Sequence, residues 1–374
     1  MSLILLEELE NDNLITLGRG NIISKEEMMQ APGDYPVYSS SATKNGEFGR
    51  YGRYMFDDER ITWSIDGGGR LFYRDKHKYS VTNVCGWLKV NTEQLLTKYV
   101  YYCLHFQWSL LNFDYTYKAH PSVIRKIYKI PMISLAEQEK IVSYLDKINN
   151  LIDKNIESLS YYDELIKSRF IEMFGSIEEN NKFEIVNIED VCLFVKDGTH
   201  QTPQYTEDSI NGFKFLSSKD VMTQKIDWSN IKYIPAELHE KLYATIKPQK
   251  NDILMSKNGV NYGVAAVNDT DEIFDIYVSL AIMRPLDIIE PYFFRCVLNS
   301  EQTKKQFDSS IKGIGVPNLH LGEIKKTKII LPPMELQKEF VEFVKLIDKS
   351  KFSVQKEINL YQELLEKKMN EYFG

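Results

Sequence analysis

Two segments of this chain carry one and the same pattern. Residues 134–175 read SLAEQEKIVSYLDKINNLIDKNIESLSYYDELIKSRFIEMFG, and residues 333–374 read PMELQKEFVEFVKLIDKSKFSVQKEINLYQELLEKKMNEYFG. The two segments align without a gap at an offset of 199 positions, Gln138 matches Gln337, and both segments end in Phe-Gly. A long repeat of this kind predicts two copies of one structural unit.

Apolar residues recur in each segment at alternating steps of three and four, the pattern of a heptad seam on a long helix. A seam this narrow needs a partner, so we expect the two helices to pack antiparallel against each other. The residues expected to form this packing are Ile141, Leu145, Ile148, Ile152, Leu159 and Ile166 in the first helix, and Phe340, Val344, Ile347, Val354, Ile358 and Leu365 in the second.

Start and stop signals support both helices. Ser134 and Glu137 have the spacing of a capping box, and Pro332 and Pro333 suit the first position of the second helix. Gly175 is placed for a C-cap. A helix of about 39 residues would extend roughly 58 Å.

The segments outside the two helices predict two globular heads of the α+β class with curved sheets. Strand-like runs alternate with glycine turns, and each head contains one expected helix, at 92–107 and 290–307. Strand-like approaches precede the long helices, at 124–133 and 324–334. The expected boundaries are 1–133 for the first head, 134–175 for the first long helix, 176–332 for the second head and 333–374 for the second long helix.

The heads themselves are weakly related. ITWSIDGGG (61–69) aligns with ILMSKNGVN (253–261), which places Ser64 opposite Ser256. The rest of the heads differ strongly. One scaffold that carries two different heads suggests two ligands, or two halves of one ligand.

Composition indicates a folded protein, with 43% hydrophobic and 26% charged residues. No apolar run approaches the roughly 18 residues of a membrane span, and the first residues lack the features of a signal peptide, so we expect a cytoplasmic protein. The net charge of −7 argues weakly against a nucleic-acid partner. The cysteines lack disulfide or zinc spacing and are expected to be buried apolar side chains; they are Cys85, Cys103, Cys192 and Cys296.

Catalytic and metal-binding motifs are not found in the sequence. It has no phosphate-binding P-loop and no dinucleotide fingerprint, and DGGGR (66–70) is interpreted as a hairpin turn. The six histidines are scattered, with neither HExxH nor metal spacing. No Ser, His and Asp are arranged as a nucleophile with its base. The sequence therefore predicts a chain that is not an enzyme and holds no metal or cofactor.

Polar, basic and aromatic residues gather around predicted turns, which suits contact with nucleic-acid edges and phosphates. The candidates in the first head are Ser40, Lys44, Asn45, Arg70, Tyr117, Lys118 and His120. The candidates in the second head are Thr199, His200, Lys219, Lys257, Asn258 and Lys312.

The whole arrangement resembles the specificity subunit of type I restriction-modification enzymes. The resemblance rests on IPMISLAEQEKIVSYLDKINNLID (130–153) and LPPMELQKEFVEFVKLIDK (331–349), each with a proline, a glutamine and a long heptad helix that ends in Phe-Gly. DGTHQTP (197–203) and YPVYSS…NGEFG (35–49) are similar to the openings of that family's target-recognition domains. The first helix departs from the pattern, because one proline precedes it where two precede the second.

This resemblance implies a DNA-binding, non-catalytic subunit in which each head is a target-recognition domain that reads one half of a bipartite, asymmetric double-stranded DNA target. The helix pair would set the spacer and dock methyltransferase subunits, and motor-nuclease subunits would join them. S-adenosylmethionine, ATP and Mg are then expected on the partner subunits, none of them in this chain. An alternative from another class is a protein-interaction scaffold, with two binding heads on a coiled-coil strut and no DNA contact.

Overall fold

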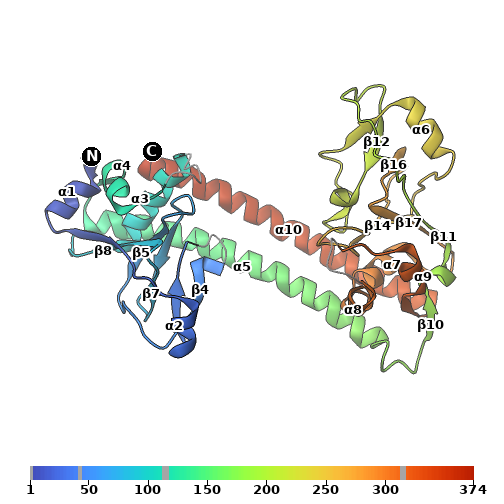
Figure 1. The fold of residues 1–374 in the computed structure, drawn as a ribbon, viewed down its shortest axis with the longest axis horizontal. Coiled ribbons are helices and arrows are strands. Elements are labelled where there is room, and N and C mark those ends of the chain that lie inside the picture. The colour runs from blue at the N-terminus through green and yellow to red at the C-terminus, as the bar shows by residue number, and fades with distance from the viewer. Residues whose placement is uncertain (1–2, 41–43, 112–117, 312–316) are drawn as a thin grey trace. The chain divides into compact units, whose positions relative to one another are not determined.

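The computed structural model describes residues 3–40, 44–111, 118–311 and 317–374. The chain forms two compact units, residues 1–157 with 354–374 and residues 158–353. Unit 1 contains the first head and unit 2 the second head, and each unit also contains part of both long helices (Figure 1).

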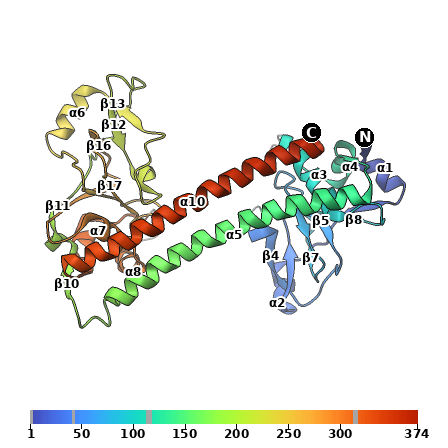
Figure 2. The ribbon, with the colours of Figure 1, turned by 180° about the vertical axis from the view of Figure 1, so that it is seen from behind.

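The long helices are α5 (Leu135–Phe174) and α10 (Met334–Phe373), each of 40 residues. Within each unit they run side by side and antiparallel (Figures 1 and 2). In unit 1, the Asn155 amide donates to the Glu357 carboxylate at 3.2 Å. In unit 2, Lys351 Nζ lies 2.6 Å from Asp163 Oδ1. The predicted antiparallel pairing is therefore confirmed within each unit.

The predicted caps of α5 are present. The Ser134 amide donates to the Glu137 carboxylate at 3.1 Å, and the Glu137 amide donates to Ser134 Oγ at 3.3 Å, which completes a capping box. Gly175 has φ +75° and its amide donates to the Ile171 carbonyl at 2.8 Å, as in a left-handed C-cap. Helix α10 begins one residue after Pro333, so the two prolines precede the helix and do not occupy its first turn.

The first head contains two sheets of more than two strands, together with a two-stranded ribbon of β1 and β9. The larger is antiparallel with strand order β2-β8-β5-β6, and the smaller has the order β4-β3-β7, in which β3 and β7 are parallel. The strands are β1 (Leu3–Leu5), β2 (Ile15–Arg19), β3 (Tyr35–Tyr38), β4 (Glu47–Tyr51), β5 (Arg60–Ser64), β6 (Leu71–Arg74), β7 (Ser80–Val81), β8 (Cys85–Val90) and β9 (Lys129–Pro131). The helices are α1 (Leu6–Asn11), α2 (Lys25–Gln30), η1 (Lys44–Gly46), α3 (Thr97–Leu110) and α4 (Pro121–Ile127).

The second head repeats this topology. Its sheets have the orders β11-β17-β14-β15 and β13-β12-β16, with β12 and β16 parallel. The strands are β10 (Glu184–Asn187), β11 (Cys192–Asp197), β12 (Phe213–Leu216), β13 (Lys232–Ile234), β14 (Ile253–Ser256), β15 (Ala265–Val267), β16 (Phe274–Ile276), β17 (Leu280–Pro285) and β18 (Lys328–Leu331). The helices are η2 (Ile188–Val191), η3 (Ser218–Val221), α6 (Ala236–Tyr243), α7 (Pro291–Leu298), α8 (Glu301–Ser310) and α9 (Leu321–Lys326).

The weak alignment of the heads is confirmed by this shared topology. Ser64 ends β5 and pairs with the first residue of β8, and Ser256 ends β14 and pairs with the first residue of β17. The β1–β9 ribbon of the first head likewise corresponds to the β10–β18 ribbon of the second. The repeated unit is therefore a whole head followed by a long helix.

Three element predictions were wrong in detail. The helix expected at 290–307 is two helices, because Ser300 Oγ accepts the Thr303 amide and starts a new helix, while the Asn299 side chain bonds the Ala265 backbone. The helix expected at 92–107 is α3, which begins at Thr97. The approaches at 124–133 and 324–334 are only partly strand, since the short helices α4 and α9 precede β9 and β18.

Each head packs against the first turns of one long helix and the last turns of the other. In unit 1 the Phe373 ring lies 5.6 Å from Tyr99, and in unit 2 the Phe174 ring lies 5.3 Å from Phe293. Burying such a ring contributes about 2–3 kcal/mol. The twelve predicted packing residues named above are each buried or partly buried, and Leu145 packs against the head as well as the other helix. The helices are therefore part of each head's core.

Candidate nucleic-acid interface

In the second head, several loops meet where β11, β12, β14 and β16 end and β17 begins. The Thr199 amide donates to the Ile276 carbonyl at 3.1 Å, and the Lys257 amide donates to the Ser279 carbonyl at 2.8 Å. We call this surface the second loop face. It comprises residues 197–200, 217–220, 227–230, 257–261 and 277–279.

The equivalent surface of the first head is built by the same backbone bonds. The Asn21 amide donates to the Val81 carbonyl at 3.2 Å, as Thr199 does to Ile276, and the Ala119 amide donates to the Ile65 carbonyl at 2.9 Å, as Leu319 does to Lys257. This first loop face comprises residues 19–21, 39–40, 44–46, 64–70, 82–84 and 118–120. One framework therefore presents two different sets of side chains.

Three predicted residues in the first head have structural contacts. Ser40 Oγ donates to the Val84 carbonyl and accepts the Asp66 amide at 3.4 Å, so it joins two loops. Lys118 Nζ lies 3.4 Å from the Asp66 carboxylate, with its side chain 77% exposed. His120 precedes α4 and its Nδ1 accepts the Ser122 amide at 3.3 Å, so its ring caps the helix.

The remaining first-head candidates are near the turns that follow β3 and β5. Asn45 is exposed and has φ +53°, within the short helix that also contains Lys44. Arg70 is exposed, with its guanidinium 5.5 Å from the Phe72 ring centre. Tyr117 lies outside the described residues.

The placement of Lys257 contradicts its prediction as a DNA contact. This residue is only 5% exposed, and Lys257 Nζ lies 2.6 Å from Asp197 Oδ2. His200 Nε2, whose side chain is 75% exposed, lies 3.4 Å from the same oxygen. Because a buried charge is costly to separate from its partner, Lys257 positions the loops and does not reach into solvent.

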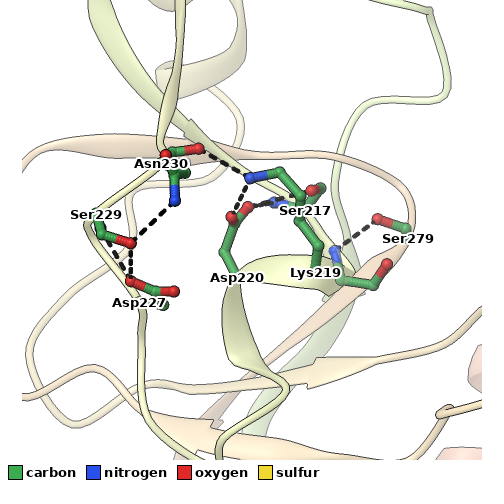
Figure 3. Close-up of polar contacts among 8 residues, drawn as sticks. Ser217, Lys219, Asp220, Asp227, Ser229, Asn230 and Ser279 are labelled. Atoms are coloured by element: carbon green, nitrogen blue, oxygen red, sulfur yellow. Dashed lines mark hydrogen bonds and ion pairs between the residues drawn. The ribbon is translucent and has the colours of Figure 1, made fainter. Parts of the chain in front are cut away.

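Lys219 is half-exposed and also has a structural role, shown in Figure 3. Its Nζ donates to Asp220 Oδ1 at 2.6 Å and to the Asn230 carbonyl at 2.9 Å. Asp220 in turn accepts the Ser217 amide at 2.8 Å and so caps η3. The ammonium thus fastens residues 227–230 to the turn after β12 while one side of it stays open to solvent.

The remaining second-head candidates are Thr199, Asn258 and Lys312. Thr199 Oγ1 accepts the Gln201 amide at 3.2 Å. Asn258 Oδ1 is buried and has no hydrogen-bond partner among the described residues. Lys312 lies outside the described part of the chain.

Several residues of the loop faces escaped the sequence reasoning. Asp197 holds Lys257 and His200, and Ser279 Oγ accepts the Ser218 amide at 3.0 Å. Arg19 ends β2 in the first head, and Asn21 lies two residues beyond it. Asp197 stands within the quoted DGTHQTP motif, so it could have been found, whereas no local signal marks Arg19.

A buried arginine lies beneath the first loop face. The Arg74 guanidinium lies 3.6 Å from the Tyr38 ring centre, and its Nε donates to Thr62 Oγ1 at 2.9 Å. Burial lowers the pKa of Arg74. Its side chain pairs with no carboxylate among the described residues, so its positive charge favours an anionic ligand nearby.

Among the described residues, no group of three or more His, Cys, Asp or Glu could hold a metal ion. Burial raises the pKa of Cys85, Cys103 and Cys192 to about 12, which leaves these thiols protonated and unreactive. No described helix is long and apolar enough to cross a membrane.

Comparison with known proteins decides the family. The family model described as type I restriction modification DNA specificity domain matches residues 6–160 and 180–364. The chain belongs to this family of type I specificity subunits. It is similar to the MjaVIII specificity subunit of Methanocaldococcus jannaschii, with 25% identity over 346 residues that cover 84% of this chain and 80% of that protein.

Solved structures agree on the fold. The S subunit of a type I restriction-modification system from M. genitalium has a TM-score of 0.55 and 17% identity, and covers 98% of this chain and 95% of its own. A chain from a study of complex assembly in a type I system has a TM-score of 0.56 and 13% identity, with 100% and 97% covered. The resemblance inferred from the repeat is confirmed. As a specificity subunit, the chain recognises DNA sequence and acts in a complex with other subunits.

Proposed function

We propose that each loop face reads one half of a bipartite, asymmetric DNA target. The main support for this proposal is that the two heads have the same sheet topology and yet present different side chains on equivalent loops. Identical frameworks would approach DNA in the same way, and different side chains would select different bases. The family match to a DNA specificity domain favours this proposal over a protein-interaction scaffold without DNA contact.

The helices α5 and α10 then set the distance between the half-sites and dock the methyltransferase subunits. Exposed apolar side chains on their outer surfaces suit a protein partner; they include Tyr144, Leu151, Tyr161, Leu346 and Leu360. This chain has a net charge of −7, so it has few cations to spare for DNA phosphates. Positively charged surfaces of such partners would neutralise part of the phosphate charge.

The chain itself contributes no catalytic group in this proposal. S-adenosylmethionine would be held by the methyltransferase subunits, and ATP and Mg by the motor-nuclease subunits. The loop faces are occupied by hydrogen bonds and ion pairs that order loops, which is suited to recognition and not to bond breaking.

The first test is selection from random duplexes by the chain in complex with its methyltransferase subunit. We expect enrichment of one sequence made of two defined parts and an undefined spacer. Enrichment of a single uninterrupted sequence, or of none, would refute the proposal.

The second test lengthens both helices together. Seven residues that continue the heptad pattern are inserted after Asn155 in α5 and before Glu357 in α10, which face each other. The insertion adds about 10 Å to the pair, so the spacer should grow by about three base pairs while both half-sites stay the same. A changed half-site with an unchanged spacer would show that the helices do not set this distance.

A further inference from the structure

Two polar residues, Arg19 at the end of β2 and Asn21 two positions beyond it, have backbones that are held by hydrogen bonds. Arg19 pairs with Gly86, the Gly20 amide donates to the Cys85 carbonyl at 3.1 Å, and the Asn21 amide bonds Val81. The backbone therefore stays extended through these three residues. Alternate residues of an extended chain project to the same side, about 6.6 Å apart, so Arg19 and Asn21 share one side.

The second head uses the equivalent positions differently. Asp197 corresponds to Arg19, because it pairs with Ala281 and precedes Gly198, whose amide donates to the Leu280 carbonyl. The Asp197 carboxylate is engaged by Lys257 and His200. This position in the second head is therefore neutralised within the protein.

In the first head no such pair forms. Ile65 stands where the second head has Lys257, and it is 5% exposed in the core. Arg19 and Asn21 are both exposed, and neither side chain has a hydrogen bond or ion pair with any described residue. Two side chains with unused donors thus lie on the first loop face.

We propose that Arg19 and Asn21 form a base-reading pair of the first head; this rests on the proposed function. Arginine donates two hydrogen bonds to guanine O6 and N7, and asparagine pairs with adenine N6 and N7. Their spacing of about 6.6 Å lies within reach of neighbouring base pairs, which are about 3.4 Å apart. The first half-site therefore contains a guanine and an adenine close together.

The experiment uses the complex with the methyltransferase subunit and duplex libraries that are random in the first half-site and keep the selected second half-site. Arg19→Ala should lower the preference for guanine at one position about tenfold or more, and Asn21→Ala should do the same for adenine at a nearby position. Arg53→Ala is the matched control, because it also removes one exposed positive charge. Arg53 follows β4, whereas residues 44–46 of the first loop face precede that strand. The thermal midpoints of all three variants should equal that of the unaltered complex.

Other results would overturn the inference. Equal weakening on every sequence, with a salt dependence reduced by about one ion, would show that Arg19 contacts a phosphate and reads no base. An unchanged base preference, or the same change in Arg53→Ala, would also exclude the pair. These outcomes are distinct from failure of the proposed function, in which the unaltered complex itself selects no two-part sequence.

Discussion

Gln138 and Gln337 make the same three hydrogen bonds in their respective heads, and both are fully buried. Gln138 Oε1 accepts the Leu96 amide at 2.9 Å, and Gln337 Oε1 accepts the Glu290 amide at 2.8 Å. Leu96 and Glu290 are the N-caps of α3 and α7. Each glutamine therefore joins the start of a long helix to the start of a helix in the head.

The donor side of each glutamine completes the junction. Gln138 Nε2 donates to the Gln94 and Ile133 carbonyls, and Gln337 Nε2 donates to the carbonyls of Ile288 and Pro332. All of these backbone groups would lose their partner if the amide were removed. A buried polar group without a partner costs about 1–3 kcal/mol.

We therefore expect Gln138→Leu and Gln337→Leu each to lower the free energy of unfolding by about 3 kcal/mol, as more than one backbone group is left unsatisfied. Urea unfolding followed by circular dichroism measures this loss. Gln362→Leu, at an exposed position of α10, is the control and should change it by less than about 0.5 kcal/mol. A large cost at only one of the two buried glutamines would contradict their structural equivalence.

Two glycines hold the loop faces in place. A Cβ on Gly20 would lie 1.9 Å from the Val81 carbonyl oxygen, and one on Gly198 would lie 2.0 Å from that of Ile276. Neither backbone can yield easily, so Gly20→Ala should displace the first loop face and Gly198→Ala the second. Duplex selection should show lost preference in one half-site only, a different one for each variant. Gly322→Ala, where a Cβ meets nothing within 4 Å, should leave both unchanged.

The Lys257–Asp197 pair should behave as a structural unit. Lys257→Met leaves the mostly buried Asp197 carboxylate without its cation and should cost about 3 kcal/mol of stability. Combining it with Asp197→Leu should restore much of this loss, because an apolar pair replaces an ion pair. The exposed pair of Lys241 and Glu237 is the control, and Lys241→Met should leave the stability nearly unchanged. Additive costs in a double-mutant cycle would show that the pair is not coupled.

Asp275 should make stability depend on pH. It is 3% exposed, and its Oδ2 lies 2.7 Å from His239 Nδ1. Burial raises the pKa of Asp275, with the interaction with His239 opposing it. The folded protein then retains a proton that the unfolded chain releases, so the Asp275 contribution to stability falls as pH rises from the ordinary value near 3.9 through the folded-state pKa.

Asp275→Asn removes this titration and serves as the reference. The free energy of unfolding of the unaltered protein minus that of the variant should be largest near pH 4 and decline with rising pH, by at most about 1.4 kcal/mol per pH unit. Asp271→Asn, at a side chain 86% exposed, should give a nearly flat difference. A difference that grows with pH would mean that the His239 interaction outweighs burial.

The repeat allowed the long helices, their caps and their antiparallel pairing to be predicted. These features depend on heptad spacing and on residues within a few positions, such as Ser134 with Glu137, and local interactions are visible in a sequence. Two further glutamines, Gln107 and Gln306, are separated by the same 199 positions in the sequence. Gln107 bonds the Lys129 backbone and Gln306 bonds that of Lys328, each through two bonds, at the same offset of 199.

By itself, then, the sequence determined a protein built twice from a head and a long helix, and its family. Only the tertiary structure decided which polar side chains of the loop faces are paired within the protein and which are exposed to solvent. Lys257 resembles a surface lysine in sequence, yet Asp197, 60 positions away, holds it in the interior. Arg19 carries no motif, yet its counterpart in the second head is Asp197 and its own side chain is exposed. The partner of a charged side chain is set by strand pairing between distant segments, and sequence spacing does not contain that information.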